Sequence, residues 1–88
     1  METAIITVRT PGGKFEKDME LPTNLSVRDL SAKLYDIVLM VDPLSVRGIR
    51  QPKLFAGRQQ NTPLEDALNL DEQGIFDGAV ITIGGKKE

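Results

Sequence analysis

Residues 53–59 have the sequence Lys-Leu-Phe-Ala-Gly-Arg-Gln, and this stretch decides the expected fold. Leu54 and Phe55 are typical of a strand, and Gly57 can adopt the backbone conformation that a tight turn requires. The pattern predicts a short strand, a turn at Gly57 and a second short strand. A further turn and a closing strand are expected over residues 75–83, where an Asp-Gly pair precedes the run Ala-Val-Ile-Thr-Ile.

The residues before this stretch predict a hairpin followed by one long helix. β-Branched residues at 4–8 predict the first strand, and Thr-Pro-Gly-Gly at 10–13 predicts its turn. Residues 14–21 alternate between apolar and charged side chains, apart from Lys17 on the apolar face, so one face of the second strand is expected to be buried.

Ser26 is expected to cap the helix, with Asp29 in its first turn. The Asp42-Pro43 pair is expected to end it. An apolar stripe with helical spacing is expected to pack on the sheet: Val27, Leu30, Leu34, Ile37, Val38 and Val41. Leu39 and Met40 widen the apolar surface. They are interpreted either as an extended core stripe under the following loop or as a contact for a partner.

A single long helix can cover only one face of a sheet, so an α+β fold is expected, with a mixed sheet of four to five strands grasping the helix. The first strand is expected in the centre, parallel to the last strand. A short helix is predicted at 64–68, because Thr62 can cap it and Pro63 suits its first position. We expect one domain over residues 1–84 and a flexible tail over 85–88.

The composition argues against catalysis and cofactor binding. The chain contains neither histidine nor cysteine, which removes the commonest general base, metal ligand and thiol nucleophile. No enzyme activity, cofactor or metal is therefore expected. The net charge of -2 gives no reason to expect nucleic acid as a partner, and no apolar run approaches the ~20 residues of a membrane-spanning helix. No basic stretch precedes the first apolar residues, so no secretory signal is expected and the chain is placed in the cytoplasm.

Gly84-Gly85 permits two interpretations. A diglycine is the group that activating enzymes adenylate in ubiquitin and in sulfur carriers, and that chemistry needs a free carboxylate on an extended arm. Here three residues follow Gly85, and no arm separates Ile83 from the diglycine. A turn that ends the strand is the simpler interpretation, because glycine is common where strands end.

The string at 54–59, followed by Leu-Glu-Asp at 64–66, resembles the second half of ubiquitin. The whole chain resembles a ubiquitin-like (β-grasp) protein and is most similar to the YukD/EsaB family, through residues 15–22, 26–30 and 74–83. This resemblance implies a cytosolic accessory or regulatory component of bacterial type VII (ESX-like) secretion, which binds a protein partner. The alternatives are a modifier or sulfur carrier processed to Gly85 and, third, an RNA-associated β-grasp domain.

The resemblance to ubiquitin also implies a binding surface on the sheet. Ile81 and Ile83 are expected to point inward, which leaves Val80 and Thr82 outward. An apolar anchor beside arginines is the composition of binding hot spots. The expected protein-binding residues are Leu54, Arg58 and Val80, with Arg47 and Arg50 at the edge. Leu54 is alternatively a core residue, because apolar strand residues are usually buried.

Overall fold

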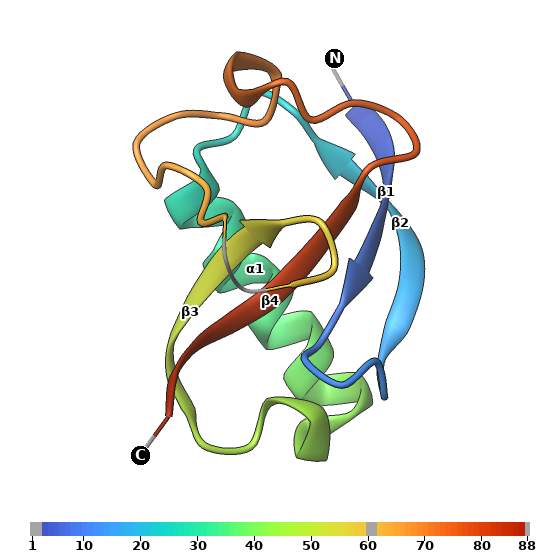
Figure 1. Cartoon of the computed structure of the whole chain (residues 1–88), viewed down its shortest axis with the longest axis vertical. Coiled ribbons are helices and arrows are strands. Elements are labelled where there is room, and N and C mark those ends of the chain that lie inside the picture. The colour runs from blue at the N-terminus through green and yellow to red at the C-terminus, as the bar shows by residue number, and fades with distance from the viewer. Residues whose placement is uncertain (1–2, 60–61, 88) are drawn as a thin grey trace.

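The structure is a computed structural model that describes residues 3–59 and 62–87, the last two by their backbone alone. A four-stranded sheet in the order β2-β1-β4-β3 packs with one face against a single long helix (Figure 1). Its elements are β1 (Thr3–Arg9), β2 (Glu16–Pro22), α1 (Val27–Val41), the 3₁₀ turn η1 (Pro43–Val46), β3 (Ile49–Ala56), the 3₁₀ turn η2 (Asp71–Gln73) and β4 (Val80–Lys87). The expected α+β architecture, with a mixed sheet on one helix, is confirmed.

β1 is one of the two inner strands of the sheet, as expected from its dense run of β-branched residues. It pairs antiparallel with β2 along its whole length and parallel with β4 from Thr7↔Val80 to Arg9↔Thr82. Inward residues such as Ile6 and Val8 are fully buried, whereas Ile5 on the outer face keeps 49% of its surface exposed. The two outer strands, β2 and β3, are the edges of the sheet among the described residues.

The core lies between α1 and the inner face of the sheet. Ser26 begins the helix as predicted, since its Oγ accepts a hydrogen bond from the Asp29 N–H at 3.3 Å. The helix buries Val27, Leu30, Ser31, Leu34 and Val38. Ile37 was expected in this stripe but keeps 40% of its surface exposed, and Val41 keeps 60%. Ile37 lies beside the stripe and Val41 lies beyond its last buried residue, so the sheet covers neither side chain.

The segment after Gly57 differs from the prediction. Gly57 does adopt a positive φ of 84°. The described residues between Gly57 and β4, however, form only one isolated bridge with β3, Phe55↔Pro63. The Leu64 N–H donates to the Leu54 carbonyl, and the Ala56 N–H donates to the Thr62 carbonyl, both at 2.9 Å. Residues 62–64 therefore pair briefly with β3 instead of starting the short helix predicted at 64–68.

The diglycine lies inside β4, which continues to Lys87. Gly84 pairs with Lys53, Gly85 pairs with Pro52, and the ladder ends at the pair of Ile49 with Lys87. The expected strand-ending turn and the flexible tail at 85–88 are therefore corrected: residues 85–87 belong to the sheet, and residue 88 lies outside the described residues. The cause is backbone pairing with the first half of β3, which sequence patterning does not reveal.

Candidate protein-binding surfaces

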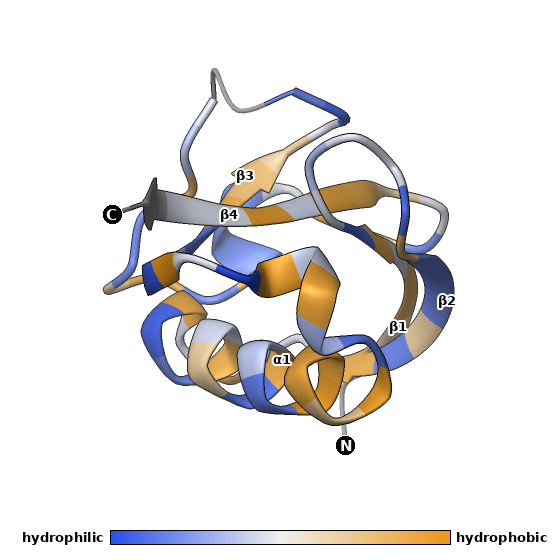
Figure 2. Cartoon of the chain, turned by 90° about the horizontal axis from the view of Figure 1, so that it is seen from below, coloured by the Kyte–Doolittle hydropathy of each residue, from blue (hydrophilic) through white to orange (hydrophobic). Residues whose placement is uncertain are grey.

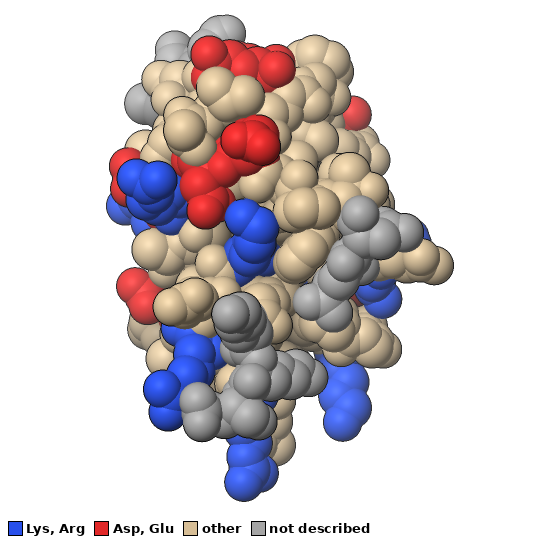
Figure 3. Space-filling model, turned by 60° about the vertical axis from the view of Figure 1, so that its left-hand side comes forward, with Lys and Arg blue, Asp and Glu red and all other residues tan. Residues whose placement is uncertain are grey.

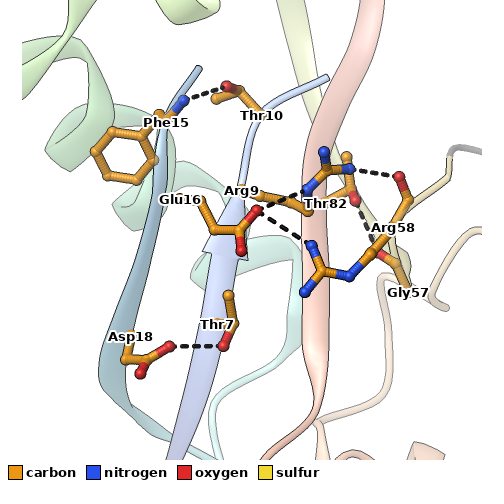
Figure 4. Close-up of polar contacts among 9 residues, drawn as sticks. All are labelled: Thr7, Arg9, Thr10, Phe15, Glu16, Asp18, Gly57, Arg58 and Thr82. Atoms are coloured by element: carbon orange, nitrogen blue, oxygen red, sulfur yellow. Dashed lines mark hydrogen bonds and ion pairs between the residues drawn. The ribbon is translucent and has the colours of Figure 1, made fainter. Parts of the chain in front are cut away.

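The outer face of the sheet, opposite α1, carries a polar network around Arg58 (Figure 4). The Glu16 carboxylate accepts from the Arg9 guanidinium at 3.3 Å and from the Arg58 guanidinium at 3.2 Å. Arg9 also donates to the Arg58 carbonyl, and the Thr82 hydroxyl donates to the Gly57 carbonyl at 2.7 Å. These contacts hold the segment after β3 across β4 and β1, and they balance the Arg58 charge.

Much of the rest of this outer face is also polar, although Ile5 is half exposed on it. Thr7 donates to Asp18, which faces it across the β1–β2 ladder, at 2.6 Å. Thr3 donates at 2.8 Å to Glu20, which faces Ile5. Val80 is only half-buried, and Thr82 is buried beneath the segment to which it bonds. The expected inward register of Ile81 and Ile83 is confirmed, because both are fully buried.

Leu54 is not the apolar centre of this surface. It is fully buried and pairs with Ile83 on the inner face of the sheet. Side chains alternate along a strand, so the outward position belongs to its neighbour Phe55, which pairs with Thr82 and is half-buried. The sequence string around Leu54 could not distinguish these registers, and the structure makes Leu54 a core residue.

The four remaining predicted residues fall into two groups. Arg58 and Val80 lie near the end of the β3–β4 ladder where Ala56 pairs with Ile81. Arg47 follows η1 and Arg50 lies near the start of β3, at the opposite end of the same ladder, and both are exposed. The structure therefore does not bring the predicted arginines together around one centre.

A cluster of exposed apolar side chains lies where α1 ends and η1 begins. We call it the helix-end patch and define it as Ile37, Met40, Val41 and Leu44, whose exposed fractions are 40%, 86%, 60% and 73%. Their spacing of three, four and seven residues places the helical members on one side of α1. Seen from this end in Figure 2, apolar residues make up much of the last turn of α1 and of the segment that follows it.

Of the two interpretations of the helix end, burial under the following loop is wrong. Met40 is the most exposed large apolar residue of the described chain, and Leu39, on another side of the helix, keeps 43% of its surface exposed. The segment after Pro43 inserts Val46 into the core and turns Leu44 toward solvent. The sequence shows that the end of α1 is apolar. Its exposure to solvent depends on the path of the segment after Pro43, which the sequence pattern does not specify.

Other parts of the surface offer little chemistry. A shallow pocket of about 280 Å³ lies beside the first turn of α1, between Arg28, Lys53 and the segment 63–67. Two of its lining residues, Lys53 and Asp66, form an ion pair at 3.6 Å. Within the described residues, no group of three or more acidic, histidine or cysteine side chains is placed to hold a metal ion. No described helix is long and apolar enough to cross a membrane.

Comparison with protein families gives one match that covers almost the whole chain. The family described as WXG100 protein secretion system (Wss), protein YukD, matches residues 3–83. Among curated proteins, the sequence has no match.

Solved structures that resemble the chain share its fold at low sequence identity. The ubiquitin-like domain of EccD5 from Mycobacterium xenopi aligns over 100% of this chain and 99% of its own, with a TM-score of 0.79 and 14% identity. The ubiquitin-like domain of the type VII secretion protein EccD1 from Mycobacterium tuberculosis covers 97% of this chain and 100% of its own, with a TM-score of 0.65 and 21% identity. One chain of a MycP5-free ESX-5 inner membrane complex aligns with a TM-score of 0.78 and 19% identity. The alignment covers 100% of this chain and 22% of that chain. The fold is therefore ubiquitin-like.

Proposed function

This chain belongs to the YukD family of the WXG100 protein secretion system, and we propose that it is a non-enzymatic, cytoplasmic binding module that docks on another component of that system. One similar structure is a domain of a type VII secretion protein, and another is part of an ESX-5 inner membrane complex, so the fold occurs within assemblies of this kind. A binding role requires a surface that a partner can cover.

The observation that supports the proposal is the helix-end patch. Met40 and Leu44 project into solvent from the end of α1, where the domain itself leaves them uncovered. Contiguous exposed apolar surface of this kind marks interaction sites in soluble proteins, because covering it removes apolar area from water. Arginine is enriched at such sites, and exposed Arg47 follows Leu44 by one 3₁₀ turn. Arg50 stays a predicted contact, as does the separate surface at Arg58 and Val80, and we rank both below the helix-end patch.

The alternative function, a modifier or sulfur carrier, needs a diglycine on a free arm. In this structure Gly84 and Gly85 are paired with Lys53 and Pro52 inside the sheet. The ladder leaves no arm between the domain and the diglycine, which favours the binding module over the conjugated modifier.

The test of the proposal is capture of the other secretion components encoded in the same genome, combined with secretion of a WXG100 substrate in a deletion strain. Met40→Asp and Leu44→Asp should each reduce capture and secretion at least tenfold, because a carboxylate at the centre of a covered apolar contact loses its water. Phe76→Asp is the matched control, since Phe76 is 61% exposed but lies in the loop before β4, at the other end of the molecule (Figure 1).

Thermal unfolding followed by circular dichroism should show that all three variants remain folded, because each replaced side chain is exposed. If Met40→Asp and Leu44→Asp capture the same components as the parent and restore secretion fully, the helix-end patch is not the docking surface.

A further inference from the structure

The two edges of the sheet differ in how many backbone groups they leave free to pair with another strand. On β3, the Leu54 carbonyl accepts from the Leu64 N–H and the Ala56 N–H donates to the Thr62 carbonyl, both at 2.9 Å. Pro52, whose backbone faces the same way as that of Leu54, has no N–H to offer. The side of the molecule that carries β3 also exposes acidic and basic side chains together (Figure 3). The edge at β3 is therefore largely closed to another strand.

The edge at β2 is open. The Thr7 N–H donates to the Ala79 carbonyl and the Ile5 carbonyl accepts from the Gly78 N–H, so Thr7 and Ile5 turn their backbone groups away from β2. In an antiparallel ladder, residues opposite such positions also point their N–H and C=O groups away from the partner strand. The residues of β2 that point outward in this way are Glu16, Asp18 and Glu20. β2 borders the molecule on the right in Figures 1 and 2, and no described strand pairs with its outer side.

Positive charge near this edge is concentrated toward the turn between β1 and β2. The Arg9 and Arg58 guanidinium groups share the Glu16 carboxylate, and Lys14 lies in the turn itself. Lys17 belongs to the other face of β2, because side chains alternate along a strand. The charge of Glu16 is therefore already balanced, and this carboxylate does not attract a partner.

Negative charge dominates the outer face further along β2. Asp18 accepts from the Thr7 hydroxyl at 2.6 Å (Figure 4), and Glu20 accepts from the Thr3 hydroxyl at 2.8 Å. A hydroxyl group carries no charge, and neither carboxylate forms an ion pair with a described residue. Asp77 lies beyond β1 on the same side of the sheet, where its carboxylate accepts a backbone N–H at 2.7 Å. The open part of the edge is therefore acidic.

We propose that the edge at β2 is a second docking site, separate from the helix-end patch, for an extended protein segment with Lys or Arg opposite Asp18 and Glu20. The backbone of that segment pairs with the outward N–H and C=O groups of β2 and adds a strand to the sheet. Opposite charges that face each other across a strand pair stabilise it. The residue between the two cations lies on the face of half-buried Met19 and is apolar, so the recognised pattern is basic, apolar, basic.

A second copy of the chain fits this edge less well. In an antiparallel pair of two β2 strands, the outward residues of one copy lie opposite the outward residues of the other. Any register that pairs residues 16–20 with themselves then places a carboxylate opposite a carboxylate, and like charges in this position destabilise the pair. The acidic side chains therefore oppose self-association of the edge and favour a basic segment from another protein.

The charge preference is tested with two synthetic peptides of equal length. One peptide alternates Lys with Val, the other alternates Glu with Val, and isothermal titration against the full-length chain measures both affinities. The Lys peptide should bind at least tenfold more tightly at 50 mM NaCl, and this ratio should fall as salt screens the charges. Asp18→Lys and Glu20→Lys should each remove most of the preference. Asp36→Lys, an equal change of charge at an exposed position of α1, should leave it intact.

The backbone pairing is tested separately, because charge alone would also attract a Lys peptide. N-methylation of every second residue removes the N–H groups along one side of an extended peptide. One of the two alternate sets of N-methyl groups should reduce the affinity of the Lys peptide at least tenfold, and the other set should leave it almost unchanged. Amide exchange followed by NMR should show that the Glu16, Asp18 and Glu20 N–H groups exchange rapidly in the free chain and slowly in the complex.

Equal affinity for the two peptides, tighter binding of the Glu peptide, no binding of either, or the same effect from both N-methylated sets would overturn the inference. A dimer of the chain alone in sedimentation equilibrium, with the Asp18 N–H protected from exchange, would overturn it in favour of a second copy. These outcomes are separable from the proposed function. Met40→Asp alters the helix-end patch and should leave the affinity for the Lys peptide unchanged, so each docking surface stands or fails by its own measurement.

Discussion

Replacement of Gly85 by alanine should destabilise the domain far more than its position near the C-terminus suggests. Gly85 has a φ of 144°, which L-residues rarely adopt, and a Cβ added there would overlap the Gln51 carbonyl oxygen of β3. The backbone strain costs roughly 1–3 kcal/mol. The overlap costs about the same again, because the Gln51 backbone must move out of its pairing with β4. The expected loss for Gly85→Ala is therefore ~2–6 kcal/mol, out of the ~5–15 kcal/mol typical of a folded domain.

Gly48→Ala is the matched control for the backbone strain. Gly48 has a positive φ of 84°, and a Cβ added there meets nothing within 4 Å. Alanine at this position therefore introduces the backbone strain but no steric overlap. Its expected cost is ~1–2 kcal/mol. Urea titration and thermal unfolding of both variants give the difference. A gap of ~2 kcal/mol between them corresponds to roughly 8–16 °C in Tm for a domain of this size.

The measurement tests whether the diglycine is part of the sheet. If Gly85→Ala and Gly48→Ala unfold at the same denaturant concentration, then Gly85 is not held against Gln51, and the argument that β4 sequesters the diglycine is refuted. The same result would restore a free C-terminal arm and with it the conjugated modifier as a candidate function.

The other predictions concern the core and the diglycine. Leu34→Ala should cost ~2–5 kcal/mol, because Leu34 is fully buried, while Ile37→Ala should cost less than ~1 kcal/mol, because Ile37 is 40% exposed; equal losses in urea titration would contradict the assigned helix face. A chain trimmed after Gly85 should support no pyrophosphate exchange with an activating enzyme, because Gly85 stays paired with Pro52; robust exchange that depends on the diglycine would contradict this.

Several features of the fold could be predicted because they depend on residues close together in the sequence. Ser26 caps α1 because its hydroxyl accepts a hydrogen bond from an N–H three residues away. Pro43 ends the helix because its ring removes the backbone N–H that would continue the helical hydrogen bonds. Ile81 and Ile83 both face inward because residues two positions apart in a strand lie on the same face of the sheet. The family could also be predicted from the sequence, because the resemblance to it extends over most of the chain.

The candidate site could be predicted only in part. Met40 was marked by its apolar neighbours on the helix, but its exposure depends on where η1 runs, which no local pattern specifies. Leu54 was placed on the wrong face, because an apolar strand residue suits a core and a binding patch equally well. Arg47 and Arg50 were identified as binding residues, but their place beside the helix end rather than beside Arg58 follows from the β3–β4 ladder.

The sequence by itself determined the order of most elements, the start of α1 and the inward face of β4, because these follow from residue chemistry and local periodicity. Only the tertiary structure decided that residues 62–64 pair with β3, that Gly85 lies against Gln51 and that the end of α1 stays uncovered. Each of these depends on backbone hydrogen bonds or packing between segments distant in sequence, whose partners are selected only when the whole sheet forms.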